Sequence, residues 1–180
     1  AHGSDNGDEK AQFKLTGPGA SIFSGTGGCK PSKLYYEHEN MIADIDGDGV
    51  AEIFGIVSNR TGSGNNPRTC FWLVSFRYVN GELVPMYNAV QIGSDRPGTF
   101  GIADMDGDGK AEVYIRDRIY AAETGALLAT GNGNWDLDIN SAPVAVNILG
   151  DQTLELVCGT KIYSIPNLSN RNPGAPAALT

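Results

Sequence analysis

Apolar and polar residues alternate in short runs along most of this chain, and turn-forming residues separate one run from the next. Short runs that are rich in apolar, aromatic and β-branched residues favour strands over helices. The main runs cover residues 52–58, 71–79, 112–116 and 154–159. Since the 3.6-residue period of an amphipathic helix is convincing nowhere in the sequence, we predict an all-β protein.

Turn signals place the remaining strands. Asn80-Gly81 is a dipeptide typical of a tight hairpin, and Glu123-Thr124-Gly125 marks a second turn. Around these turns, further strands are expected over residues 82–90, 119–122, 126–130 and 162–165. Residues 59–69 are polar and predict a loop, whereas the tail that follows Pro166 is rich in Pro, Gly and Ala.

One sequence pattern occurs three times. In residues 42–54, 102–114 and 145–157, an apolar run enters an acidic, glycine-containing turn and a strand-forming run leaves it. The three segments align without gaps, and their starts are 60 and then 43 residues apart. These spacings are near the period of repeat proteins built from small sheets. The pattern predicts four strands in each of the first two units and three in the last.

The first two turns each carry acidic residues at positions 1, 3, 5 and 9. They are Asp44, Asp46, Asp48 and Glu52 in the first turn, and Asp104, Asp106, Asp108 and Glu112 in the second. Alternate positions of a tight turn point inward, so their oxygens converge, and Val50 or Lys110 at position 7 would add a backbone carbonyl. Oxygen ligands without His or Cys favour Ca²⁺, with Mg²⁺ as the weaker alternative.

The alternative interpretation of these turns is a solvated Asp-Gly turn without a metal. Carboxylates about 5 Å apart repel by roughly 0.8 kcal/mol in water and about 3 kcal/mol at an effective dielectric near 20. Four such charges in nine residues therefore favour a bound cation. An EF-hand loop is excluded, because it needs an acid at position 12, where this chain has Gly55 or Ile115.

The third turn keeps only part of the pattern. Asn147, Asp151 and Glu155 stand at positions 1, 5 and 9, but Leu149 is at position 3 and Gln152 replaces a glycine. A structural turn is therefore expected, and Asn147, Asp151 and Glu155 form a weak candidate metal site only. Two Ca²⁺ ions in the complete turns would change the net charge of the chain from −8 to −4.

The complete turns resemble the calcium loops of FG-GAP (VCBS-type) repeats, the blades of integrin-like β-propellers. Those loops have the form Asp-x-Asp-x-Asp-Gly-x-x-acid, and Phe100-Gly101 is similar to the Phe-Gly element of the family. The resemblance covers roughly residues 40–165, with Glu instead of the usual Asp at position 9. It implies four-stranded antiparallel blades whose inner strands are joined by a calcium-rigidified turn. Such proteins are typically secreted or on the cell surface, and gliding bacteria export many through the type IX pathway.

The resemblance predicts a partial β-propeller of about three blades. The expected divisions are an N-terminal polar segment or strand of a neighbouring blade (1–39), blade 1 (40–99), blade 2 (100–142), an incomplete blade 3 (143–166), and a linker or the start of a next blade (167–180). A propeller usually needs at least four blades to close, and an open edge exposes unpaired strand groups. The expected partners are therefore the remaining blades of the same chain or a capping partner.

Charge, apolar run length and cysteine content limit the possible partners and the cellular compartment of the protein. The 180-residue chain has 13 Lys and Arg against 21 Asp and Glu, which argues against nucleic-acid binding through phosphates. No run approaches 18 consecutive apolar residues, so no membrane span is expected. Cys158 lies in an apolar run and predicts a buried free thiol. Cys29 and Cys70 could pair outside the cell, although cysteine pairing cannot be deduced from sequence.

We find no recognisable catalytic constellation in the sequence. His38 stands between two glutamates, as expected of a solvated side chain, while Asp136 and Asp138 beside Trp135 favour a polar loop over a catalytic carboxylate pair. Trp135 is the one candidate for stacking on a sugar ring. We expect a calcium-stabilised extracellular module of a larger secreted protein that binds a cell-surface protein or carbohydrate. The alternative is a fragment of a propeller polysaccharide lyase, similar to rhamnogalacturonan lyases, for which no base is identifiable.

Overall fold

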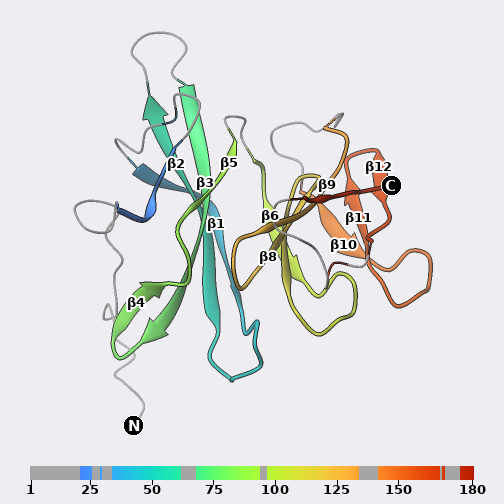
Figure 1. The fold of residues 1–180 in the computed structure, drawn as a ribbon, viewed down its shortest axis with the longest axis horizontal. Helices are drawn as coiled ribbons and strands as arrows, with labels where there is room; N and C mark the ends of the chain where they lie inside the picture. Colours follow the sequence, from blue (N-terminus) through green and yellow to red (C-terminus); the bar gives the residue numbers. More distant parts are fainter. Residues whose placement is uncertain are drawn as a thin grey trace.

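The computed structural model describes residues 21–25, 29, 34–61, 68–93, 97–133, 142–166, 168 and 175–180. Within these residues the protein is all-β, with thirteen strands in three sheets, none closed into a barrel, and no α-helix (Figure 1). The described part of the chain therefore also contains no helix long and apolar enough to cross a membrane. The three sheets follow one another across the molecule in chain order.

The first sheet contains five strands. They are β1 (Leu34–Ala43), β2 (Glu52–Thr61), β3 (Arg68–Val79), β4 (Glu82–Pro85) and β5 (Val90–Gly93), with β1 to β4 in chain order and β5 paired with β3. The single strand expected over residues 82–90 is therefore two short strands, both of which pair with β3. The expected polar loop at 59–69 is too long, because strand pairing continues from Asn59↔Cys70 to Thr61↔Arg68. β1 also begins before the expected unit boundary at residue 40.

The second and third sheets are smaller. The second contains β6 (Phe100–Ala103), β7 (Glu112–Ile115), β8 (Arg118–Ala121), β9 (Leu127–Thr130) and β13 (Ala177–Ala178), and the third contains β10 (Val144–Val146), β11 (Glu155–Cys158) and β12 (Lys161–Tyr163). β13 pairs with β9 in parallel. Ser164 N–H donates to the Thr180 carbonyl, and Leu179 N–H donates to that of Thr130. The C-terminal residues therefore bridge the second and third sheets.

The same strand pair surrounds each acidic turn. β1–β2, β6–β7 and β10–β11 are antiparallel, and their last cross-strand pairs before the turn are Ala43↔Glu52, Ala103↔Glu112 and Val146↔Glu155. The glutamate at position 9 thus always lies opposite the residue that precedes position 1. All three turns lie toward the lower side of the molecule in Figure 1. The gapless sequence alignment therefore corresponds to one shared register.

Two apolar cores join neighbouring sheets. The core between the first and second sheets includes Ile45, Phe54, Ile56, Phe100, Val113 and Ile115. The core between the second and third sheets includes Met105, Ile119, Ala129, Leu156, Cys158 and Tyr163, and the C-terminal Ala177 and Leu179 also pack in it. Since each sheet contributes one face to each contact, the second sheet is covered on both sides, as a central layer must be.

The Phe-Gly element before the second turn has a packing explanation. Phe100 is buried in the core between the first two sheets. Gly101 lies opposite Tyr114 on the paired strand, and a Cβ at Gly101 would lie 2.1 Å from the Tyr114 hydroxyl oxygen. Because that distance is far below van der Waals contact, any larger residue at position 101 would displace the tyrosine.

A third core covers the other face of the first sheet. Phe23 packs edge-on against Trp72 with ring centroids 6.0 Å apart, and the Trp72 indole N–H donates to the Ser24 carbonyl at 2.7 Å. Cys29 and Cys70 form a disulfide at this place, and both are buried. An intramolecular disulfide is typical of an oxidising compartment. It attaches the N-terminal part of the described chain to β3 across 41 residues of sequence.

The outer face of the third sheet is apolar and exposed. Val144 and Ile162 on β10 and β12 both flank Val157 of β11, and their exposed fractions are 50% and 57%. In the second sheet, Ile119 has the place of Ile162, since it pairs with Tyr114, the counterpart of Val157. Ile119 is fully buried against the third sheet. The same face is therefore covered in the second sheet and open in the third.

Two isoleucines at equivalent positions should respond differently to truncation. Ile119→Ala should lower the free energy of unfolding by about 2–5 kcal/mol, because it removes buried methylene and methyl groups and leaves a cavity. Ile162→Ala should change it by less than about 0.5 kcal/mol, as is usual at an exposed position. Urea denaturation followed by circular dichroism measures both. Similar losses for the two variants would contradict a covered face in the second sheet and an open face in the third.

Thiol chemistry should distinguish the three cysteines. Burial and the charge of Asp117 raise the pKa of Cys158 to about 12, so its thiolate is scarce near neutral pH. A thiol reagent at pH 8 should therefore label no cysteine in the folded protein and one in guanidinium. It should label all three after reduction. Mass spectrometry counts the labels, and three labels in guanidinium without reductant would contradict the Cys29–Cys70 disulfide.

Candidate metal centre

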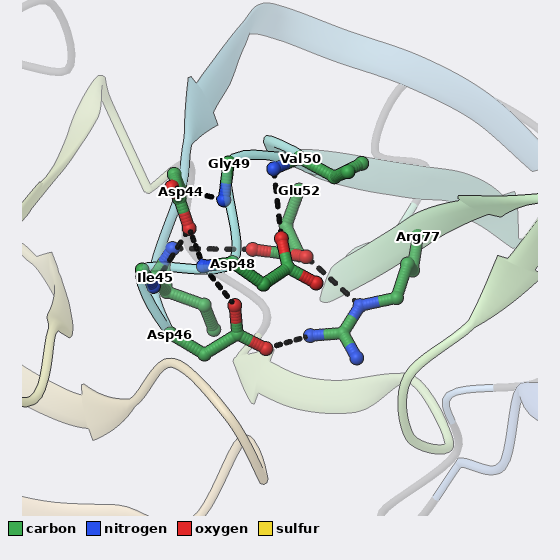
Figure 2. Close-up of polar contacts among 9 residues, drawn as sticks. Asp44, Ile45, Asp46, Asp48, Gly49, Val50, Glu52 and Arg77 are labelled. Carbon is green, nitrogen blue, oxygen red and sulfur yellow. Dashed lines mark hydrogen bonds and ion pairs between the residues drawn. The ribbon is translucent and has the colours of Figure 1, made fainter.

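The backbone of each complete turn is folded around its first aspartate. Asp44 Oδ1 accepts hydrogen bonds from the N–H groups of Gly47 (2.8 Å) and Asp48 (3.2 Å), and Oδ2 accepts from Gly49 (2.9 Å) (Figure 2). Gly49 has a φ of +85°, in the left-handed region that favours glycine. A side chain at position 1 thus caps successive N–H groups, and position 6 requires a residue without a Cβ.

The second turn repeats this arrangement. Asp104 accepts from the Asp108 N–H at 3.1 Å and from the Gly109 N–H at 2.9 Å. Gly109 has a φ of +87°, within a few degrees of its counterpart in the first turn. The Lys110 N–H donates to Asp108 Oδ1 at 2.8 Å. The two loops therefore share one fold, which follows from the same residue types at the same positions.

Three aspartates converge in each complete turn. One carboxylate oxygen from each of Asp44, Asp46 and Asp48 lies within 4.8 Å of the other two, and the same holds for Asp104, Asp106 and Asp108. Oxygens at such spacing can coordinate a single hard cation. The structure therefore brings together the residues that the sequence predicts at positions 1, 3 and 5.

The other predicted ligands, at positions 7 and 9, make hydrogen bonds within the turn, and their role as ligands stays a prediction. The Val50 N–H donates to Asp48 Oδ1 at 2.7 Å, as the Lys110 N–H does in the second turn. Position 7 thus helps to close the loop, and its carbonyl as a ligand stays a prediction. The glutamates at position 9 do not belong to either group of converging oxygens.

The position-9 glutamate is a buried brace in all three turns. Its Oε2 accepts the N–H at position 2: Glu52 from Ile45 at 3.1 Å, Glu112 from Met105 at 2.9 Å and Glu155 from Ile148 at 2.7 Å. All three glutamates are buried. Our sequence reasoning missed this role, although a signal was present. The third turn lacks a carboxylate at position 3 but still has glutamate at position 9. Glutamate would be kept in this way if position 9 served the structure of the turn rather than metal binding.

The first turn contains an internal counter-charge. Arg77 on β3 donates from Nε to Glu52 Oε1 at 2.8 Å and forms an ion pair with Asp46 Oδ2 at 2.6 Å (Figure 2). The hydrogen bond with Glu52 raises the pKa of Arg77 further above its usual value, so the guanidinium stays charged. Asp46, one of the three converging aspartates, and Glu52 are thus linked through the guanidinium of Arg77. The sequence gives no local signal for this contact, because Arg77 lies 25 residues beyond Glu52.

The second turn contains a glutamate with a raised pKa and a buried carboxylate oxygen on Asp106. The pKa of Glu112 is raised to about 8. Burial is the main cause, and the charges of the three aspartates of the turn add to it, whereas the hydrogen bond from the Met105 N–H opposes it. Asp106 Oδ2 accepts the Leu168 N–H at 2.5 Å, but within the described chain the buried Asp106 Oδ1 has no hydrogen-bond partner. A carboxylate oxygen in that state is costly unless a cation or water satisfies it.

The third turn is held by hydrogen bonds of its own. The Asn147 amide donates to the Asp151 carbonyl, and Asn147 Oδ1 accepts the Gly150 N–H at 2.5 Å. The Thr153 N–H and hydroxyl both donate to Asp151 Oδ1 at 2.9 Å and lower the pKa of Asp151. An amide at position 1 thus supplies a donor where the other turns carry a charge, which supports the expectation of a structural turn.

Other predicted residues lie outside the described part of the chain. This applies to Trp135, the candidate for sugar stacking, to Asp136 and Asp138, and to the side chain of His38. Their roles stay predictions. Comparison with protein-family models, with curated proteins and with solved structures gives no match. The resemblance to FG-GAP repeats therefore rests on sequence motifs alone.

Two substitutions of Glu112 should separate bracing from charge. Glu112→Ala leaves the Met105 N–H without its acceptor and should lower the free energy of unfolding in EGTA by about 1–3 kcal/mol. Glu112→Gln keeps an oxygen acceptor for the same N–H in a side chain of nearly the same shape, so its loss should be smaller. Urea denaturation in EGTA compares the two. Equal losses would contradict the bracing role of the carboxylate.

Proposed function

We propose that this protein is a calcium-stabilised extracellular module whose two complete acidic turns each bind one Ca²⁺. The observation that carries the proposal is the convergence of three aspartate oxygens in each of two equivalent turns. A cluster of like charges in a small volume destabilises the folded chain, and a divalent cation would reverse that effect. Carboxylate oxygens in a flexible loop suit Ca²⁺ better than Mg²⁺, which prefers to keep its water molecules.

The ligands would come from the turn itself. Asp44, Asp46 and Asp48 would bind the first ion, with a Val50 carbonyl and water completing the coordination. The second ion would be bound by the equivalent residues, Asp104, Asp106, Asp108 and Lys110. Glu52 and Glu112, which the sequence also predicts as ligands, hold the turns through the N–H at position 2 and would add negative charge near the ion.

A bound ion would stiffen the connection between two core strands. Each turn links strands that contribute to the cores between sheets, since Ile45 and Met105 at position 2 of the turns are themselves buried core residues. An ordered turn therefore fixes the place of a core side chain. We infer that calcium stabilises the packing between sheets as well as the turns themselves.

The arrangement of sheets supports a partial β-propeller as the architecture. Three sheets with one register pack successively through equivalent faces, and the next face in the series is exposed on the third sheet around Val144 and Ile162. The proposed partners are accordingly further blades of the same protein or a capping partner. A repetitive sheet array of this kind would serve as an adhesion or ligand-binding module of a larger secreted cell-surface protein, with a surface protein or carbohydrate as its target. The Cys29–Cys70 disulfide supports the extracellular setting.

Calcium should raise the thermal stability of the protein. An ion that binds only the folded chain adds about 2.7 kcal/mol at a concentration 100-fold above its Kd, so each site should raise Tm by about 5–10 °C. Differential scanning calorimetry in EGTA, in calcium and in magnesium measures the shift, and magnesium should produce less of it. The same Tm in EGTA and in millimolar calcium would contradict the proposal.

Matched alanine variants locate the effect. Asp46→Ala and Asp106→Ala should each remove part of the calcium-dependent rise, because each deletes one oxygen ligand from one turn. Asp151→Ala in the third turn is the control and should leave that rise intact, although it removes the hydrogen bonds from Thr153.

A further inference from the structure

The residues at position 2 of the three turns are equivalent in sequence but differ in burial. Ile45 packs in the core between the first and second sheets, and Met105 packs in the core between the second and third. Ile148 has the same position in the third turn and is 49% exposed. By this equivalence it faces the side of the third sheet that the described chain leaves uncovered. We define the end face of the third sheet as the exposed apolar residues on this side: Val144, Val146, Ile148 and Ile162.

The first sheet exposes apolar residues in the opposite direction, close to its own turn. In the sequence alignment of the three turns, Ile42, Ile102 and Ala145 are equivalent, and each lies two residues before position 1. Ile102 packs against the core that joins its sheet to the preceding one, and so does Ala145. Ile42 is 69% exposed. The position that contacts a preceding sheet is therefore covered in the second and third sheets and open in the first.

Tyr78 of β3 lies on the same side of the first sheet. Phe76 and Tyr120 are equivalent, because each pairs with the residue that follows a position-9 glutamate. Two residues farther along the strand, Tyr78 thus has the position of Ala122. Ala122 is buried in the core between the first two sheets, whereas Tyr78 is 45% exposed. We define the end face of the first sheet as Ile42 and Tyr78.

The described N-terminal residues cover this side of the first sheet at a different place. Phe23 packs on Trp72, and Cys29 is bound to Cys70. Trp72 and Cys70 pair with residues of β2 that are remote from the acidic turn, whereas Ile42 is next to the turn. The disulfide-linked N-terminal residues and the end face of the first sheet therefore occupy separate parts of one side.

We propose that the end face of the third sheet binds the end face of the first sheet in a second copy of this chain. The two faces match because the cores inside the chain already join the same positions, those that face a following sheet and those that face a preceding one. The contact would bury apolar side chains that are exposed in the single chain, and such burial favours association. This inference rests on the proposed architecture, whose capping partner it names, but not on calcium.

A second copy fits because one chain carries both end faces. Contacts in both directions between two copies of three sheets would give a ring of six sheets. Propellers close with about four to eight blades, so six sheets lie within that range. A head-to-tail contact that closes into a ring also leaves no free end for further growth. Two copies would thus cover both end faces without any other partner.

Sedimentation velocity of the 180-residue chain, from about 1 to 100 µM, tests the proposal. The wild-type chain should form a dimer as concentration rises. Ile162→Arg and Ile42→Arg should each abolish it at these concentrations, because each places a charge in every contact of a homodimer. Both residues are exposed in the single chain, so the variants should keep the circular dichroism spectrum of the wild type. Val79→Arg is the control, since Val79 is exposed on the other side of β3 from Tyr78 and should leave the dimer intact.

A mixture of the two arginine variants distinguishes a head-to-tail contact from pairing of identical faces. The Ile42→Arg chain keeps an intact end face on its third sheet, and the Ile162→Arg chain keeps one on its first sheet. The mixture should therefore form a mixed dimer through one intact contact, although neither variant dimerises alone. Disulfide trapping gives a second measurement: Ile42→Cys and Ile162→Cys chains should cross-link to each other on oxidation and not to themselves.

The outcomes separate this inference from the proposed calcium sites. Loss of the dimer in each arginine variant and its return in the mixture support the inference. A chain that stays monomeric throughout, or an Ile162→Cys chain that cross-links to itself, overturns it. The measurements are repeated in EGTA and in calcium. A dimer whose Tm does not respond to calcium would contradict the calcium sites alone, and a monomer stabilised by calcium would contradict this inference alone.

Discussion

The structure depends on how it accommodates mutual repulsion among carboxylates at the turns between its core strands. Two of these turns place three aspartate oxygens within 4.8 Å of one another, close to a buried glutamate that holds the turn together. The acids also determine the shape of the loop, because the first aspartate and the glutamate accept hydrogen bonds from its N–H groups. The charge that folds the turn is thus the same charge that destabilises it.

The three turns differ in the groups that surround their acidic residues. The first brings Arg77 from a neighbouring strand onto two of its acids. In the second, Ala121 stands opposite the glutamate, a buried oxygen of Asp106 has no hydrogen-bond partner among the described residues, and the pKa of Glu112 is raised to about 8. The third replaces the acid at position 1 by Asn147, whose amide donates a hydrogen bond inside the turn. The chain thus supplies a cationic partner to the first turn and an amide donor to the third.

Repetition of this unit also explains the packing. The three strand pairs around the acidic turns share one register, so the faces of successive sheets carry apolar residues at equivalent positions, and one sheet covers the next. Residues 21–25 and 29 cover the other face of the first sheet, where the Cys29–Cys70 disulfide attaches them to β3. At the other end of the series, the outer face of the third sheet is apolar and exposed at Ile162. A chain built in this way has an open apolar face at its third sheet, which fits association with another sheet.

The sequence by itself determined the local features: the all-β class, the hairpin at Asn80-Gly81 and the converging aspartates, because each depends on residues a few positions apart. Only the tertiary structure decided the contact of Arg77 with Glu52, the pairing of β13 with β9 and the division of residues 82–90 into two strands. It also assigned the position-9 glutamates to bracing the turn. These features depend on which strands become neighbours and in which register, and that is fixed by burial of apolar faces across the whole chain rather than by any short segment.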